Sequence, residues 1–268
     1  MPFYLSVSGS TILSDSSRLS ELFAWGCSAI EIGSFSDEQA YSYVLRECRK
    51  RHMRLAIHSP FYKDGNRYGL LQGEGSAWTE LERDLSIAQR DELAYVLIHF
   101  PYFSSPVQRG SVAAIRKAAH QIVLLSQKYQ IPVLIEPKLG PGCDHSLLRL
   151  LHALPLADLE AWGLAFCIDV GDLYIASKLS DMPYLDLVSH LAPLTHAVHL
   201  HDVAVTEEGY IWTPITGSDS VPIAETLTLL RPEKWDIYLV LEHTPHLMES
   251  TQQVQQGINW LRSQQNLA

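Results

Sequence analysis

The chain has 268 residues, and 20 lysines and arginines against 30 aspartates and glutamates give it a formal net charge of −10. Hydrophobic residues make up 47% of the sequence and charged residues 19%, which excludes an intrinsically disordered chain. The acidic balance argues against an electrostatic grip on nucleic acid, because such a grip needs clustered lysines and arginines. No apolar run approaches the roughly 18–20 residues that span a bilayer.

The four cysteines form no Cys-x-x-Cys pair, so the sequence offers neither a zinc ribbon nor a thioredoxin-like motif. We interpret them as reduced and structural, and residues 1–14 lack the basic segment of a signal peptide. These features predict a cytoplasmic protein that binds a small molecule rather than nucleic acid or a membrane. The same features are compatible with a homo-oligomer.

Short apolar runs, typical of strands that are covered on both faces, recur eight times along the chain. The runs are Phe3–Val7, Ala29–Ile32, Leu55–His58, Tyr95–Phe100, Pro132–Glu136, Leu164–Asp169, His196–Leu200 and Ile237–Glu242. Segments with helical spacing lie between or after them. These are Ser17–Trp25, Asp37–Arg51, Trp78–Leu93, Val107–Tyr129, Asp144–His152, Tyr184–Leu191, Ile223–Leu230 and Thr251–Leu261.

Repeated alternation of strand and helix implies parallel strands joined by right-handed crossovers. Eight such units in about 250 residues predict an α/β fold, a single (β/α)8 TIM barrel that forms one domain over residues 1–268. The alternative is an open doubly wound sheet, which needs a glycine-rich phosphate turn after its first strand. That turn reads Ser8-Gly9-Ser10-Thr11 here, so the sequence favours the barrel.

Ionisable side chains stand at the ends of seven of the eight expected strands. They are Glu31, His58, His99, Glu136, Asp169, His199 with His201, and Glu242. In a (β/α)8 barrel all strand carboxyl ends meet at one mouth, where the active sites of this fold lie. Burying so many carboxylates together is costly, and a divalent cation is the simplest compensation. Carboxylates and imidazoles are ligands for such ions.

Each position also has a simpler interpretation. A single histidine such as His58 or His99 at a strand end is more often a hydrogen-bonded structural residue. Asp169 would also serve as the N-cap of a helix that follows it. The joint pattern is what favours a metal site, because chance explains the whole set far less well than any one member.

Six segments at these strand ends follow one another in a familiar order. They are Ala56–Pro60, Leu97–Phe100, Leu134–Pro137, Cys167–Asp172, Val198–Asp202 and Leu241–Glu242. In this order they resemble the xylose isomerase-like TIM barrels, which include sugar isomerases and epimerases and metal-dependent apurinic endonucleases. The resemblance covers nearly the whole chain; it is moderately specific for the superfamily and poorly specific for a reaction.

The resemblance implies that one divalent metal, zinc or manganese above all, is held by four ligands. These are Glu136, Asp169, His199 and Glu242. It also implies that His58 and His99, with the shared Glu136, match the ligands of a second metal in the endonuclease branch.

Two departures from the endonuclease pattern stand out. Asp172 replaces a histidine of that branch, and the loop at 207–214 lacks its Asp-x-His. The third metal site of the endonucleases is therefore absent from the sequence pattern, which together with the acidic charge argues against DNA repair.

Three functions follow as hypotheses. In the first, a metal-dependent isomerase or epimerase acts on a small sugar or keto-hydroxy compound, and Glu136 and Glu242 exchange protons through a metal-stabilised enediolate. Substrate-binding residues would then be Glu31, Lys138, Asp172 and His201. The alternative is a dinuclear-metal phosphodiester hydrolase on a small substrate. The third is a binding protein that has lost catalysis.

Two long connections bear on the substrate. The stretch Pro60–Gly75, with its glycines and tyrosines, suits a lid that closes over a ligand. Tyr210 and Trp212 follow the seventh strand and suit either stacking on a ligand or plugging of the barrel. His243 and His246 add two imidazoles near the mouth, to which the sequence assigns no role.

Overall fold

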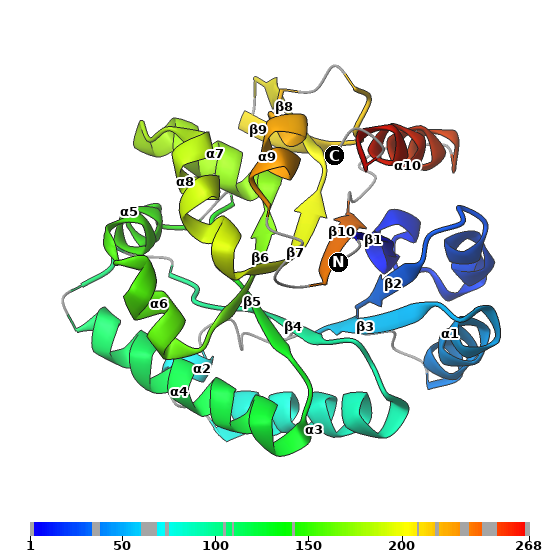
Figure 1. The fold of residues 1–268 in the computed structure, drawn as a ribbon, viewed down its shortest axis with the longest axis horizontal. Helices are drawn as coiled ribbons and strands as arrows, with labels where there is room; N and C mark the ends of the chain where they lie inside the picture. Colours follow the sequence, from blue (N-terminus) through cyan, green and yellow to red (C-terminus); the bar gives the residue numbers. More distant parts are fainter. Residues whose placement is uncertain are drawn as a thin grey trace.

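The computed structural model describes residues 3–33, 38–59, 69–72, 75–103, 106–108, 110–140, 143–207, 209–217, 220–230, 236–242 and 251–265. Its strands close into a barrel in the order β1-β10-β7-β6-β5-β4-β3-β2, and neighbouring strands are parallel throughout. Figure 1 shows the strands at the centre and the helices around them. The predicted TIM barrel is confirmed.

The barrel strands agree with the expected runs to within two residues at each end. They are β1 (Phe3–Ser8), β2 (Ala29–Ile32), β3 (Arg54–His58), β4 (Val96–His99), β5 (Val133–Glu136), β6 (Ala165–Asp169), β7 (Thr195–Leu200) and β10 (Ile237–Leu241). Their apolar composition is explained by burial, because one face lines the barrel and the other meets the helices.

The α-helices are α1 (Glu38–Arg51), α2 (Gly69–Gln72), α3 (Gly75–Asp91), α4 (Ser111–Tyr129), α5 (Ser146–Ala153), α6 (Leu156–Trp162), α7 (Val170–Ser180), α8 (Tyr184–Leu191), α9 (Ile223–Leu229) and α10 (Thr251–Gln265). The described residues also include the 3₁₀ helices η1 (Gly9–Ile12) and η2 (Ser16–Phe23), between β1 and β2, and η4 (Ala192–Leu194), before β7. No described helix is long and apolar enough to cross a membrane.

The barrel interior holds its own small cluster of buried residues, separate from the larger core between strands and helices. This cluster includes Ala29, Ala56, Leu97, Leu134, Cys167, Ala197 and Val240. Side chains alternate between the two faces of a strand, so the residue two positions further on also points inward. Those next residues are the ionisable strand-end groups. They form the top layer of the interior, at the mouth of the barrel.

The structure differs from the expected elements in three places. The segment from Ser16 is the 3₁₀ helix η2, whose start is held by the Asp15 side chain through Ser17. Helix α6 was not expected, and α7 was expected only through the alternative role of Asp169 as an N-cap. Because α7 is buried on most of its surface, it has no polar face to give an amphipathic pattern.

The third difference follows β7, where a loop was expected. The chain instead forms an antiparallel hairpin of β8 (Asp202–Thr206) and β9 (Gly209–Thr213). The Asp202 carboxylate ties its base to the next segment by accepting hydrogen bonds from the backbone N–H groups of Ser220 and Val221. Most of the expected lid Pro60–Gly75 lies outside the described residues.

Candidate metal centre and active site

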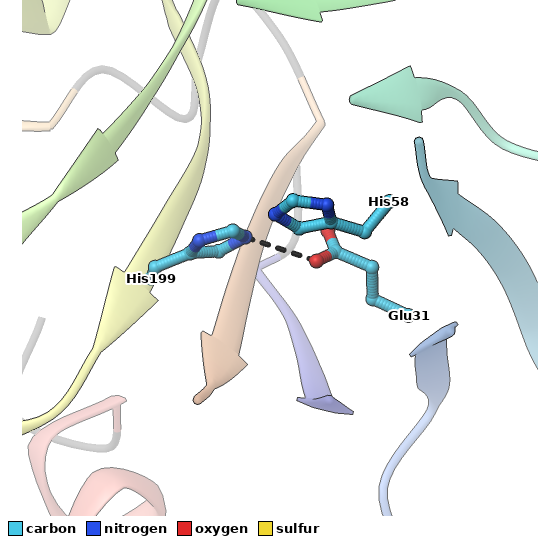
Figure 2. Close-up of side chains that lie close together, drawn as sticks. All are labelled: Glu31, His58 and His199. Carbon is cyan, nitrogen blue, oxygen red and sulfur yellow. Dashed lines mark ion pairs between the residues drawn. The ribbon is translucent and has the colours of Figure 1, made fainter. Parts of the chain in front are cut away.

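His199, on β7, is the centre of the site, and three carboxylates from three other strands surround it. Its Nε2 lies 3.0 Å from Glu31 Oε1, and its Nδ1 lies 3.1 Å from Glu136 Oε2 and in contact with Glu242. Figure 2 shows Glu31 and the His58 ring beside His199, close to Nε2. The imidazole and Glu31 have no exposed surface. Closure of the barrel therefore brings β2, β5, β7 and the residue after β10 to one imidazole.

Several of these atoms are buried without a hydrogen bond. Glu31 Oε1, Glu136 Oε2 and both ring nitrogens of His199 have no hydrogen-bond partner among the described residues, although they lie at contact distance from one another. Buried polar atoms are normally paired, so orphaned ones call for an explanation. Carboxylate oxygens that converge on one nitrogen of an imidazole suit the coordination of a divalent cation.

Four overlapping groups of described residues have the spacing of metal ligands; besides Glu31 with His58 and His199, and Glu136 with Cys167 and His199, there are two that match the sequence expectations. In the first, Glu136, Asp169, His199 and Glu242 each offer an atom within 4.8 Å of the others. In the second, His58, His99 and Glu136 do the same, with the two histidines 3.9 and 3.5 Å from the Glu136 carboxylate. These are the two ligand sets that the sequence resemblance implied. Oxygen and imidazole donors of this kind suit zinc and manganese.

Asp169 has two of the roles considered from the sequence. Its Oδ1 accepts a hydrogen bond from the Asp172 backbone N–H at 2.8 Å, so it is the N-cap of α7. The same oxygen lies 2.8 Å from His201 Nε2. A helix cap and a place in the ligand cluster therefore coexist in one side chain.

A second cluster of charged groups lies beside the first. Lys138 Nζ is 3.0 Å from Glu136 Oε1 and 2.8 Å from Asp172 Oδ2. The indole N–H of Trp212, on β9, donates to Asp172 Oδ1 at 3.1 Å. Asp172 packs directly over Gly140, where a Cβ would come within 2.4 Å of Oδ1. The ammonium group is thus held between two buried carboxylates, one of them a candidate ligand.

The charges in the site shift the pKa values of its members. Burial raises the pKa of Glu242, but the adjacent His199 outweighs burial and lowers that pKa to about 2. Burial lowers the pKa of His201, whereas Asp169 raises it, and the result is about 9. For His99 burial prevails over the attraction of Glu136 and lowers the pKa to about 4. At neutral pH the site therefore presents an ionised Glu242 and a neutral His99.

Lys138 and Glu136 each shift the pKa of the other and so stabilise one another's charged form. Burial lowers the pKa of Lys138, but Asp172 and Glu136 raise it well above its ordinary value. Burial raises the pKa of Glu136, and the Lys138 ammonium with His99 holds it well below its ordinary value. Both groups stay charged at neutral pH.

A cavity of about 140 Å³ opens at this mouth of the barrel. It is lined by His58, His99, Glu136, Lys138, Asp169, His201, Trp212 and Glu242. Glu31, His199 and Asp172 are outside this lining and buried, so the structure places Glu31 and Asp172 behind residues that face the cavity. His243 and His246 lie outside the described residues.

Comparison with known proteins agrees with this geometry. The family model described as "Xylose isomerase-like TIM barrel" matches residues 19–264. The chain belongs to this family. No curated protein sequence matches it.

Several solved structures share the xylose isomerase-like barrel. A D-tagatose 3-epimerase-like protein has a TM-score of 0.70 and 16% identity, over 99% of this chain and 98% of that one. An L-ribulose 3-epimerase has a TM-score of 0.71 and 10% identity, over 99% and 95%. A xylose isomerase-like protein from Mycobacterium smegmatis, in complex with magnesium, has a TM-score of 0.67 and 9% identity, over 99% and 97%. At such identities these likenesses show the fold.

Two residues of this xylose isomerase-like site were not anticipated from the sequence. Cys167 belongs to a group with ligand spacing together with Glu136 and His199, and burial raises its pKa to about 12. Tyr95 donates a hydrogen bond to Glu31 Oε2 at 2.6 Å. Strand periodicity could have placed both in the interior, because Cys167 precedes Asp169 by two residues and Tyr95 is two residues before Leu97.

Proposed function

We propose that the protein is a divalent-metal-dependent isomerase or epimerase of a small sugar or keto-hydroxy compound. The observation that carries the proposal is the pair of carboxylates, Glu136 and Glu242, that meet at the Nδ1 of His199 and also line the cavity. An enzyme that inverts the configuration of a hydroxyl-bearing carbon by proton transfer uses two such groups, one to remove a proton and one to return it on the other face.

Glu136, Asp169, His199 and Glu242 would hold the metal, and His58 and His99 surround the adjoining side of Glu136. A divalent cation there supplies Lewis acidity, which stabilises negative charge on a bound carbonyl or hydroxyl oxygen. The proposal for zinc or manganese rests on the donor atoms, because three carboxylates with one imidazole suit either ion.

Glu242 is the better placed of the two proton carriers. Its side chain is 21% exposed, whereas that of Glu136 is 1% exposed and is held by Lys138 and two histidines. Both carboxylates have lowered pKa values and stay ionised, and a lower pKa makes a weaker base, so the advantage of Glu242 is its exposure. A base needs to reach the proton it removes, so an exposed carboxylate at the cavity wall is the natural acceptor.

The remaining polar lining would bind substrate oxygens. Lys138 carries N–H donors at the cavity wall and is fixed by Asp172 behind it. His201, in the same wall, already directs its two ring nitrogens at Asp169 Oδ1 and the Asp202 carbonyl oxygen. Side chains that are already held in place lose little further entropy on binding, which favours precise orientation of a small substrate.

The test is proton exchange in deuterated water. Purified protein with zinc, manganese, cobalt or magnesium is incubated with a panel of ketoses, and deuterium at the carbon next to the carbonyl is read by NMR. We expect exchange with the wild type and at least a 100-fold lower rate with Glu242→Gln. Glu82→Gln, an exposed carboxylate on α3, is the matched control and should keep the wild-type rate. Unchanged exchange in Glu242→Gln would remove Glu242 from the mechanism.

A second candidate is the dinuclear phosphodiester hydrolase, which the His58–His99–Glu136 group specifically favours. Two metals that share Glu136 would place a water between them for attack on phosphorus. Metal counting separates the candidates: one tightly bound ion per chain supports the isomerase, and two support the hydrolase. His99→Ala should lower the count from two to one only in the second case. A chain that binds none would favour a binding protein without catalysis.

A further inference from the structure

A chain of three buried side chains runs beneath the floor of the cavity. Tyr95 Oη donates to Glu31 Oε2 at 2.6 Å, and Glu31 Oε1 lies 3.0 Å from His199 Nε2. Glu31 and His199 have no exposed surface, and Tyr95 is 1% exposed. Figure 2 shows the Glu31 carboxylate beside the edge of the His199 ring that carries Nε2. The chain meets His199 at Nε2, whereas Glu136 and Glu242 meet it at Nδ1. Glu31 also has ligand spacing with His58 and His199.

The two carboxylate oxygens of Glu31 have different neighbours. Tyr95 engages Oε2, so Oε1 is the oxygen that faces His199. Burial raises the pKa of Tyr95 well above its ordinary value, so its hydroxyl remains a donor over the whole working range of pH. A carboxylate with one oxygen fixed in this way cannot rotate without losing a buried hydrogen bond.

A metal-bound His199 needs a lone pair on one ring nitrogen and carries its proton on the other. Nδ1 is directed at Glu136 and Glu242, where a cation would need its lone pair. A neutral imidazole carries one proton and one lone pair, so the proton must then reside on Nε2. Glu31 is the acceptor that lies on that side. The Tyr95 hydrogen bond leaves Oε1 as the carboxylate oxygen on that side, and Oε1 approaches Nε2 to 3.0 Å, at hydrogen-bond distance but without hydrogen-bond angles.

We propose that Glu31 is a positioning residue that holds His199 in the tautomer whose Nδ1 lone pair faces the metal, and that Tyr95 holds Glu31 in place. The proposal rests on the metal site of the proposed function but on no particular reaction. Carboxylate partners of this kind, which bind the far nitrogen of a metal-ligating histidine, raise metal affinity by fixing its orientation. Glu31 acts through His199 and does not touch the substrate.

The experiment measures binding of Zn²⁺ and Co²⁺ to the metal-stripped protein by competition with a chromophoric chelator. We expect Glu31→Ala to weaken binding by 10- to 100-fold (order of magnitude) and Tyr95→Phe to weaken it by several-fold. Glu31→Gln should recover most of the affinity, because its amide oxygen still accepts a hydrogen bond from Nε2–H. The visible spectrum of the Co²⁺ form gives a second readout, and Glu31→Ala should shift the ligand-field bands more than Glu31→Gln does.

A matched pair elsewhere in the barrel controls for general loss of stability. Tyr41, on α1, donates to the buried Asp91, the last residue of α3, at 2.7 Å. Asp91→Asn and Tyr41→Phe should leave Zn²⁺ affinity within twofold of the wild type. Wild-type affinity in Glu31→Ala would overturn the proposal, and so would equal loss in Glu31→Gln and Glu31→Ala, since charge rather than orientation would then matter. Tyr95→Phe, which removes a single hydroxyl, keeps the proposal testable if Glu31→Ala does not fold.

These outcomes are separate from those of the proposed function. Metal binding that depends on Glu31, in a protein that exchanges no proton of any ketose, would leave this inference standing and remove the isomerase. A protein that exchanges the proton of a ketose, but whose metal affinity does not change in Glu31→Ala, would remove this inference and leave the isomerase standing. A wild type that binds neither ion would overturn both.

Discussion

Gly171 lies directly against the imidazole of His201: a Cβ on Gly171 would come within 2.0 Å of Cε1. Gly171 is the second residue of α7, and His201 follows β7, so the glycine lets the ring pass over the start of the helix. There His201 reaches Asp169, the N-cap of the same helix. The absence of a side chain at 171 is therefore a requirement of the site and not of the helix.

Gly171→Ala should displace His201 from Asp169. The added methyl group cannot be accommodated without moving a ring that is 2% exposed, and overpacking of this kind costs about 1–3 kcal/mol. We expect a fall of the unfolding free energy in that range, measured by urea denaturation, and loss of most of the proton exchange. Gly33→Ala, where a Cβ would meet no atom within 4 Å, is the control. Equal stability of the two variants would contradict the packing argument.

Lys138→Met should destabilise the metal-free protein strongly. It removes the ammonium group from between Glu136 and Asp172, both 1% exposed, and leaves two buried carboxylates without their cation. Breaking a buried ion pair costs about 3–5 kcal/mol, and the partial exposure of Lys138 places the expected loss at the lower end.

The comparison for Lys138→Met is Lys128→Met, which breaks the exposed pair with Glu82 and should cost less than about 1 kcal/mol. Urea denaturation in the presence of a chelator measures both variants. Losses of the same size in the two variants would show that the Lys138 cluster contributes no more than a surface pair.

Asp91 should make stability depend on acid pH. Hydrogen bonds from Arg90 and Tyr41 outweigh burial and hold the pKa of Asp91 below its ordinary value of 3.8. Folding therefore favours the carboxylate. Its contribution is complete above the unfolded pKa and is lost as the pH falls through the lower, folded pKa.

The pH dependence is measured as the difference in unfolding free energy between the wild type and Asp91→Asn. That difference should be constant from pH 7 to about pH 5 and should shrink below about pH 4. A difference that stays the same down to pH 3 would show that the carboxylate is not stabilised by the fold.

Removal of metal should lower thermal stability by an amount that the ligand set controls. A ligand that binds only the folded state at 100 times its Kd adds about 2.7 kcal/mol to the unfolding free energy. For a chain of this size we expect a rise of the Tm by several degrees when zinc is added to stripped protein. Asp169→Asn should reduce this rise, whatever it does to the Tm without metal, whereas Asp91→Asn should preserve it. A full rise in Asp169→Asn would exclude Asp169 from the ligands.

Much of the fold follows from local features of the sequence. Near-continuous apolar runs located every barrel strand, and strand–helix alternation predicted their parallel closure. Helix α7 has no amphipathic stripe, since it is buried on most sides, so in the sequence only its N-cap Asp169 indicated it. The hairpin β8–β9 was missed because its stability comes from Asp202 and from Trp212, whose partners are distant in the sequence.

The candidate site was predictable as a set of residues but not as an arrangement. Strand ends of a barrel converge by topology, so Glu136, Asp169, His199 and Glu242 could be expected together before any coordinate was known. The depth of each side chain in the barrel could not be predicted, because it depends on the register between strands. Glu31, expected to contact substrate, lies below the cavity with no exposed surface, and Lys138 is pinned between two carboxylates.

The sequence by itself thus determined the barrel and the set of ionisable groups at its mouth. Strand periodicity and the order of the elements can both be read from local stretches of the chain. Only the tertiary structure decided which of those groups pair. Glu31 faces His199, Asp169 faces His201 and Asp172 faces Lys138, each across a contact of 2.8–3.0 Å. Such pairings depend on the stagger of closed strands and on the space left by Gly140 and Gly171, and both arise from packing across the whole barrel.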